Sequence, residues 1–377
     1  MSQAAVGPHL SDRQRLHWLR LIRTPNVGPA SFRDLINRFG SAETAIEMLP
    51  EIMMAGGANR LVRVPSVAEA EAEMQLARRC GARFVALGEH DYPQTLARMD
   101  NPPPLLAVKG TAAAFGLPPV AIVGARNASL AGIKMARMLA SELGRNGYCV
   151  ISGLARGIDT AAHQGSLDTG TVGVLAGGID RPYPPENTRL CDEIAERGAI
   201  VSEMPFGWEP RAQDFPRRNR IVAGLALGLV VVEAAQRSGS LISARLAGEL
   251  GRLVFAVPGS PLDPRAAGTN GLLKDGATLV TEAADVLEAL APLVTGQPFV
   301  PTRLEEPPDF TATPPPVDGD RARVVEALGP VPVEIDELIR HTKLHPAQIF
   351  MILLELDLAG RLERHSGGRV SLVAPDM

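Results

Sequence analysis

The chain has 377 residues, of which 45% are hydrophobic and 21% are charged, and its formal net charge is −4. This length exceeds a single ordinary core, so two or three domains are expected, and the composition excludes a chain that is disordered throughout. A surface coated in positive charge is excluded as well, so any polyanion must be held by a local cluster of cations.

Neither the cysteines nor the hydropathy pattern indicates export. Cys80, Cys149 and Cys191 are far apart and form no Cys-x-x-Cys pair, which argues against a zinc site or a disulfide framework and fits a reducing cytosol. The N-terminus lacks a cationic segment before an apolar core, and no apolar run reaches the roughly 18 residues that cross a bilayer. We therefore expect a soluble cytoplasmic protein with no membrane contact, no cofactor and no metal.

Residues 1–80 are predicted to form a helical domain of the SAM or helix-hairpin-helix type. Apolar residues recur at helical spacing from residue 10 to about residue 49, and TPNVGPASFRDLINRFGS places a Gly-Pro turn between two helix patterns. Such a turn can aim backbone N–H groups at a phosphate. A helical packing module without a ligand fits equally well, because only Arg33 and Arg38 offer charge nearby.

Residues 81–295 are predicted to form a Rossmann-like, doubly wound α/β domain. Short runs such as VAIVG, YCVISG, TVGVLAGG and LGLVVVEA alternate with helical segments of about a dozen residues. This alternation implies right-handed crossovers and a parallel sheet with helices on both faces. The runs are continuously apolar, as burial on both faces requires.

A Pro-rich linker is expected at residues 296–318, followed by a winged-helix domain at residues 319–377 with three helices and one hairpin. Binding of duplex DNA by the third helix would be the usual inference. The residues resist it, because residues 318–377 carry seven basic side chains against ten acidic ones and the third helix reads IFMILL. Protein contact or plain packing is therefore favoured over base recognition.

The unusual residues of the central domain follow its strands. Gly124 and Arg126 come after the first, Gly153, Arg156 and Gly157 after the second, and the RSGS loop with Ser238, Gly239 and Ser240 after the run VVVEA. Ligands of open parallel sheets bind beyond the carboxyl ends of the strands, and glycine loops with arginines suit phosphate. A cap role remains open for Asp159 and for the Gly-Ser pair, and His163 is expected to be a packed or exposed side chain, not a catalyst.

The run DFPRRNR adds cations close to the same sheet edge. Pro216 can start a helix, which would place Arg217, Arg218 and Arg220 in its first turn or just before it. The flanking residues are apolar and the protein is net acidic, so a dedicated anion cluster is favoured over a solvated charged face. Phe215 is equally a candidate to stack on a base or to lie in the core.

These strings together resemble the DNA-processing protein A family (DprA, also called Smf). VAIVGARNAS, ISGLARGIDTAAH, TVGVLAGGIDRPYPPEN, DFPRRNRIVAGLA and VVVEAAQRSGSLISARLA occur in the family's order, and RFVALGEHDYPQTLARMDNPPPLLAVKG matches its approach to the sheet. The resemblance covers about residues 15–290. It implies a non-enzymatic protein that binds single-stranded DNA, protects incoming strands during natural transformation, loads the RecA recombinase and forms a homodimer.

The resemblance also implies the residues that contact the strand. By motif position they are Gly124, Arg126, Gly153, Arg156, Gly157, Phe215, Arg217, Arg218, Asn219, Arg220, Ser238, Gly239 and Ser240. Ala125 replaces the family's usual Ser, which removes a hydroxyl donor, and Arg156 stands where Lys is frequent, which keeps the charge.

Two other functions remain as alternatives. One is an enzyme like the nucleoside-monophosphate phosphoribohydrolases, but Ile242 and Ser243 stand where the acidic residues of that chemistry would be needed. The other is a nucleotide-sensing transcription regulator that reads an operator with its winged helix, against which the acidic, apolar third helix counts.

Overall fold

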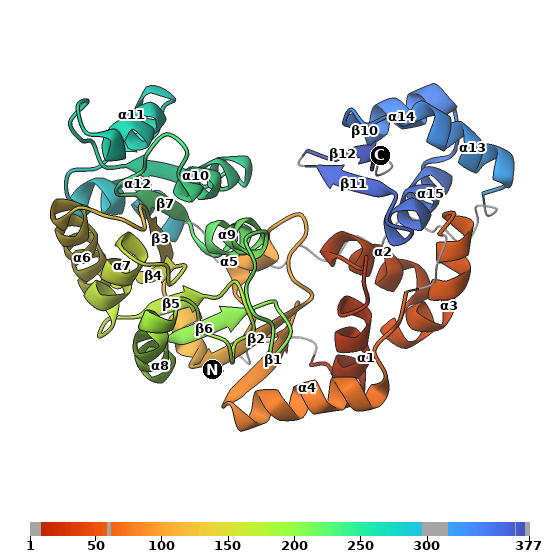
Figure 1. The fold of residues 1–377 in the computed structure, drawn as a ribbon, viewed down its shortest axis with the longest axis horizontal. Coiled ribbons are helices and arrows are strands. Elements are labelled where there is room, and N and C mark those ends of the chain that lie inside the picture. Colours follow the sequence, from red (N-terminus) through yellow and green to blue (C-terminus); the bar gives the residue numbers. More distant parts are fainter. Residues whose placement is uncertain (1–8, 59–61, 296–315, 366, 374–377) are drawn as a thin grey trace. The chain divides into compact units, whose positions relative to one another are not determined.

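The computed structural model describes residues 9–58, 62–295, 316–365 and 367–373 (Figure 1). Its contacts divide the chain into two compact units. The first unit joins Met1–Leu10 with Glu71–Pro298, and the second joins Ser11–Ala70 with Phe299–Met377. Most of the predicted linker, residues 296–315, lies outside the described part of the chain. None of the described helices combines the length and the apolarity that a membrane span needs.

The first unit contains a nine-stranded sheet in the order β1-β2-β6-β5-β4-β3-β7-β8-β9. The seven strands from β6 to β9 in this order run parallel, whereas β1 pairs with β2, and β2 with β6, in antiparallel fashion. The strands are β1 (Ala82–Ala86), β2 (Leu105–Gly110), β3 (Pro119–Val123), β4 (Cys149–Ser152), β5 (Thr171–Val174), β6 (Ala199–Ser202), β7 (Gly228–Val231), β8 (Leu253–Ala256) and β9 (Thr278–Leu279).

Helices cover both faces of this sheet, so the predicted α/β fold with its largely parallel sheet is confirmed (Figure 1). Alternate residues of β3 lie in different cores: Val120 and Ile122 pack with α6 and α7, whereas Ala121 and Val123 pack with α9 and α10. The helices are α4 (Val67–Arg79), α5 (Gln94–Ala97), α6 (Leu130–Arg145), α7 (Ile158–Ser166), α8 (Thr188–Arg197), α9 (Asp214–Leu225), α10 (Gly239–Glu249), α11 (Ala267–Lys274) and α12 (Ala283–Thr295), with 3-10 turns η1 (Ala112–Gly116), η2 (Pro185–Asn187) and η3 (Pro264–Ala266).

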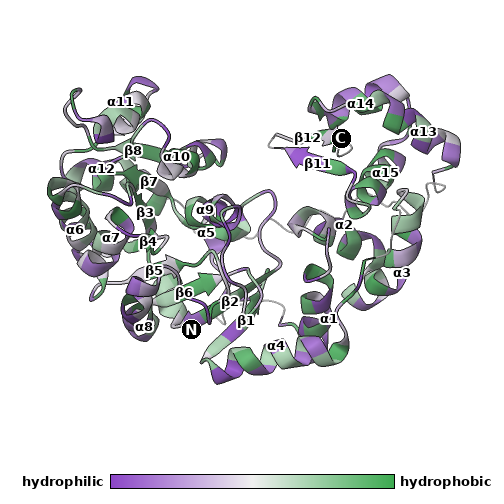
Figure 2. Ribbon diagram, viewed as in Figure 1, coloured by the Kyte–Doolittle hydropathy of each residue, from purple (hydrophilic) through white to green (hydrophobic). Residues whose placement is uncertain are grey.

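The central strands are apolar along their whole length, and Figure 2 colours β3, β4 and β7 as hydrophobic. All four residues of β4 and of β7 are buried. Side chains on both faces of a strand must be apolar when helices cover both faces. The two antiparallel strands at residues 82–110 were expected only as an approach to the sheet; the structure makes them part of it, and they cover the edge that β6 would otherwise expose.

The second unit combines the N-terminal helices with the winged helix. The N-terminal helices are α1 (Asp12–Ile22), α2 (Pro29–Phe39) and α3 (Ala42–Ala55), and α4 begins at the end of this segment. The winged helix consists of α13 (Asp318–Ala327), β10 (Val333–Glu334), α14 (Ile335–Thr342), α15 (Pro346–Leu358), β11 (Leu362–His365) and β12 (Arg369–Leu372). A short strand, β10, adds to the predicted hairpin, giving the order β10-β12-β11.

Candidate nucleic-acid interface

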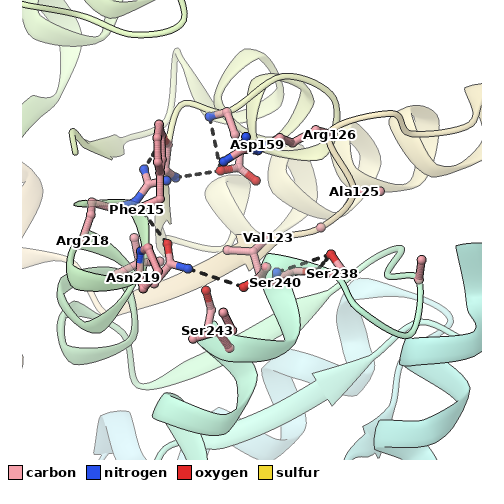
Figure 3. Close-up of a pocket in the computed structure, with 18 of the residues that line it drawn as sticks. Val123, Ala125, Arg126, Asp159, Phe215, Arg218, Asn219, Ser238, Ser240 and Ser243 are labelled. Carbon is pink, nitrogen blue, oxygen red and sulfur yellow. Dashed lines mark hydrogen bonds between the residues drawn. The ribbon is translucent and has the colours of Figure 1, made fainter. Parts of the chain in front are cut away.

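A pocket of about 540 Å³ opens at the carboxyl ends of β3, β4 and β7 (Figure 3). The sheet reverses its winding between β3 and β7, because the chain proceeds from β3 through β4, β5 and β6 on one side and continues with β7, β8 and β9 on the other. Ligands of doubly wound sheets bind at such a switch point. The loops after β3, β4 and β7 and the first turns of α9 and α10 line the pocket.

The structure gathers nine of the thirteen residues predicted to contact the strand around this pocket. They are Gly124, Arg126, Gly153, Phe215, Arg218, Asn219, Ser238, Gly239 and Ser240. The other four, Arg156, Gly157, Arg217 and Arg220, are not among the lining residues. That these residues bind DNA remains a prediction, but nine of the thirteen positions that the sequence motifs single out converge on one site.

Gly157 has a structural reason to be glycine. Its φ is +76°, and a Cβ at this position would clash with the carbonyl oxygen of Ala125. The next residue, Ile158, donates its amide to the same carbonyl at 3.2 Å. Gly157 therefore allows α7 to begin directly against the loop after β3.

Arg218 lies beneath the pocket surface with only 6% of its area exposed. Its guanidinium Nη1 donates to the carbonyls of Gly153 and Val174, and burial lowers the pKa of Arg218 to about 10. Asp159 is also buried and accepts the amides of Gly153 and Ala155 at 3.1 and 3.3 Å. Burial raises the pKa of the Asp159 carboxyl, and Arg218 opposes that rise. These two side chains fix the conformation of the loop after β4. Their hydrogen bonds occupy the amides of Gly153 and Ala155 and the guanidinium of Arg218, which could otherwise bind a phosphate.

The remaining arginines of the DFPRRNR run share one carboxylate. Arg217 Nε lies 2.8 Å from Glu203 Oε1, and Arg220 Nη2 is paired with Glu203 Oε2. Arg220 also donates to the carbonyl of Asn101. One carboxylate between two guanidinium groups leaves a net positive charge, and Arg217 remains 49% exposed. Arg156 is paired with Glu186 outside the pocket.

Arg126, Arg237 and Arg265 are the exposed cations that line the pocket. Arg265 pairs with Asp263, whereas Arg126 and Arg237 form no ion pair with any residue that the structure describes. The Arg126 guanidinium carbon lies 4.9 Å from the centroid of the Phe215 ring. Tyr183 meets the same ring edge-on, with 5.7 Å between centroids and an interplanar angle of 61°. The partly buried Phe215 is therefore covered by one cation and one aromatic edge.

Helices α6 and α10 both start near the pocket, and of these two only α10 keeps its N-terminus open. At α6, the amide and hydroxyl of Ser129 both donate to Glu233, whose carboxylate satisfies the helix dipole. At α10, the hydroxyl of the N-cap Ser238 hydrogen-bonds with its neighbour Ser240 among the described residues, and a Cβ added at Gly239 would meet no atom within 4 Å. The start of α10 therefore faces open space in the pocket and can receive an anion.

Sequence comparison identifies the family of this chain. The family model of DNA recombination-mediator protein A matches residues 83–291, which contain the whole pocket. The chain belongs to the DNA-processing protein A family. Family models of the DprA-like N-terminal HHH domain and the DprA winged helix domain match residues 12–75 and 307–368, which confirms the expected helical domain and winged helix.

Relatives of this family are similar over most of their length. Protein Smf of Escherichia coli is 39% identical over 283 residues, covering 74% of each chain. The X-ray structure of DprA from Streptococcus pneumoniae superimposes with a TM-score of 0.57 at 34% identity, covering 74% of this chain and 93% of that one. A structure of DprA from Helicobacter pylori, described as revealing a single-stranded DNA binding mode, gives a TM-score of 0.51 at 30% identity over 55% of this chain and 95% of that one.

Four charged or aromatic residues in or beside the pocket were not among the predicted contact residues. Arg237 and Arg265 line the pocket, Asp159 organises its floor, and Tyr183 packs on Phe215. Arg237 directly precedes the predicted Ser238, so the loop motif could have included it. Tyr183 lies more than thirty positions before Phe215, and no local pattern connects them. Among the residues that the structure describes, no cluster of His, Cys, Asp and Glu could hold a metal.

Proposed function

We propose that the pocket binds a single strand of DNA, and that this DprA-family chain is a non-enzymatic recombination mediator. In this proposal it protects incoming strands in the cytoplasm during natural transformation and loads RecA onto them, acting as a homodimer. The observation that carries the proposal is the group of anion donors around one concave site: Arg126, Arg237 and the open start of α10. RecA loading and dimerisation rest on the family resemblance.

The shape of the site favours a single strand over a duplex. Its donors lie in a pocket between loops, where one flexible backbone can enter and a rigid double helix cannot. The single-stranded DNA binding mode described for the Helicobacter pylori relative supports the same ligand class. With few aromatic side chains in the site, affinity should come mainly from phosphate contacts, so sequence preference should be weak.

Arg126 and Phe215 suggest how a nucleotide enters. The guanidinium of Arg126 covers the ring on which a base would stack, 4.9 Å from its centroid. A base that replaces it gains stacking worth about 1–3 kcal/mol, and the displaced guanidinium is then free to bind the adjacent phosphate. Tyr183 supports the ring from its edge. In this arrangement Arg126 covers the Phe215 ring when no DNA is bound and binds a phosphate when a base is stacked on that ring.

The first test is the Arg126→Ala variant. We expect its affinity for a labelled oligothymidylate to fall about tenfold, the loss of roughly 1.4 kcal/mol that one charge-assisted contact supplies. Arg126 is exposed and forms no ion pair in the described structure, so the unfolding temperature of the Arg126→Ala protein should equal that of the unmodified protein. Fluorescence anisotropy against single strands and matched duplexes gives the readout.

Arg189→Ala is the matched control, because Arg189 is an exposed arginine of the same unit that pairs with Glu193 on α8, outside the pocket. Its affinity should equal that of the unmodified protein. If Arg126→Ala and Arg189→Ala bind equally well, Arg126 does not contact DNA. A preference of the unmodified protein for duplex DNA would contradict the proposal as a whole.

The enzymatic alternative finds little support in the pocket. Asp159 is the one acidic residue of its described lining, and its carboxylate is occupied by two backbone amides. General acid-base chemistry needs a carboxylate that can reach the substrate. Incubation with nucleoside monophosphates should therefore release no free base, and release of base would reinstate the enzyme.

A further inference from the structure

Helix α15 of the winged helix has two apolar faces. One face packs into the winged helix itself through Ile349, Ile352, Leu353 and Leu356. The other, made of Met351, Leu354 and Leu358, packs into the core of the N-terminal helical domain. At about 100° per residue the two sets lie on opposite sides of the helix. Figure 1 shows α15 beside α2 and α3, within the second compact unit.

Polar contacts fix the same interface. The side-chain amide of Asn26, in the turn between α1 and α2, donates to the carbonyl of Leu358 at 3.1 Å. Arg361 donates to the carbonyl of Gly56 at the end of α3, also at 3.1 Å. Arg364 lies between two carboxylates, 3.1 Å from Asp34 on α2 and 2.9 Å from Asp357 on its own domain. Apolar packing and directional bonds thus connect the two domains of this unit.

In the hairpin turn of the helical domain, the backbone amides of Val27 and Gly28 form hydrogen bonds within the turn itself. The amide of Val27 donates to the carbonyl of Thr24 at 3.1 Å, and the amide of Gly28 donates to the hydroxyl of Ser31 at 2.9 Å. These are groups that such a turn would offer to a phosphate. With Asn26 bound to Leu358 as well, the turn is engaged by protein. Of the two possibilities that the sequence left open, the packing module describes this turn better.

We infer that the winged helix is a protein-binding module whose partner is the helical domain of its own chain, and that the two domains mask each other's DNA-binding elements. The outer face of α15, which a winged helix inserts into a major groove, is buried against α2 and α3. The acidic charge balance of the winged helix fits this use, because affinity for duplex DNA depends on neutralising phosphates. DNA contact is left to the first unit.

Gly56 offers a way to separate the two domains without disturbing either. Its φ of −73° and ψ of −3° suit alanine, so the backbone of α3 tolerates the change. A Cβ there would clash with the carbonyl oxygen of Glu355, a backbone atom of α15. Gly319 in α13 is the matched control, because a Cβ at that position meets no atom within 4 Å.

The experiment measures hydrogen exchange in the full-length Gly56→Ala and Gly319→Ala proteins. In Gly56→Ala, amides of α2 and of the C-terminal half of α15 should exchange at least tenfold faster than in the unmodified protein, while strands β3 to β7 keep their protection. Gly319→Ala should match the unmodified protein. Equal exchange in the two variants would overturn the inference, as would protection of α15 by added duplex DNA in the unmodified protein.

A charge cycle keeps the inference testable if Gly56→Ala does not fold. Asp34→Asn and Arg364→Gln each remove one partner of the pair that joins the domains. Because Arg364 also contacts Asp357, only the coupling between the two changes reports the interface. The double variant should unfold at the same temperature as Arg364→Gln alone. Fully additive decreases in the unfolding temperature would mean that the two residues do not interact and would overturn the inference.

Discussion

His163 is a buried residue under the sheet edge whose protonation is tied to folding. Its Nδ1 lies 2.7 Å from Thr171 Oγ1, and that hydroxyl donates its own proton to the carbonyl of Val150. The imidazole must therefore donate from Nδ1. Burial lowers the pKa of His163 to about 3, so the folded protein holds the neutral ring, as expected for a packed side chain rather than a catalyst.

This depressed pKa predicts the direction of the pH dependence. An unfolded histidine titrates near 6.5, so between about pH 6.5 and 3 the unfolded chain binds more protons at this residue than the folded one. The contribution of the neutral His163 ring to the free energy of unfolding is fully present above pH 6.5. It is lost as the pH falls below that value, at up to about 1.4 kcal/mol per pH unit. The free energy of unfolding, measured in urea, should therefore fall less between pH 6.5 and 5 in His163→Gln than in the unmodified protein. An equal fall in the two proteins would contradict this.

The arginines near the pocket mark where side-chain roles escape a sequence pattern. The run DFPRRNR predicts cations in or just before the first turn of a helix started by Pro216. Helix α9 instead begins at Asp214, so Arg217 ends the first turn and Arg218 and Arg220 lie in the second. The pattern cannot tell that Glu203, in the loop after β6, pairs with both Arg217 and Arg220, or that Arg218 turns inward. These outcomes depend on which way the helix faces the sheet. Three of the four predicted glycines, Gly124, Gly153 and Gly239, do line the pocket, because the close approach of the backbone follows from the strand order itself.

At the scale of elements, the start of α10 separates helix stability from anion binding. Gly239 is the first residue of α10, and a side chain there meets open space. In the Gly239→Asp variant, the carboxylate at the N-terminus of α10 interacts favourably with the helix dipole and stabilises the folded protein by about 0.3–1 kcal/mol. The same carboxylate repels a phosphate. We expect unfolding temperature to hold or rise while affinity for single-stranded DNA falls at least tenfold, measured by calorimetry and anisotropy.

Gly239→Asn is the neutral control of equal size. It should retain most of the affinity, since it blocks no donor by charge. If the Asp and Asn variants lose affinity equally, the loss is steric and the start of α10 is no anion site.

Whole elements were predicted where burial sets their pattern, and missed where a distant partner does. The parallel strands are continuously apolar because helices cover both faces, and this is visible in the sequence. Strand β2 was not expected, since it depends on β6, about ninety residues further along the chain. The apolar sequence of α15 predicts that this helix does not recognise bases. The structure adds that the face of α15 turned away from the winged-helix core packs against the N-terminal helical domain.

At the scale of the whole molecule, the net charge of −4 makes DNA binding a local property. The exposed cations that line the pocket are few: Arg126, Arg237 and Arg265. If about three phosphates are neutralised per site, log K should fall with log salt with a slope of about −2, at roughly −0.7 per phosphate. Arg126→Ala should reduce this slope by about 0.7. An affinity that does not change with salt would exclude phosphate contacts as its main source.

The pairing of α15 with α2 and α3 also sets an order of events on the ribosome. Residues 11–70 are made first, but α15, the helix that covers their apolar face, follows only after about 280 further residues. At about 5–20 residues per second, translation leaves that face without its partner for about 14 to 56 seconds. The apolar face of the nascent helical domain therefore stays exposed during that interval, and its packing is completed only after the winged helix has left the exit tunnel.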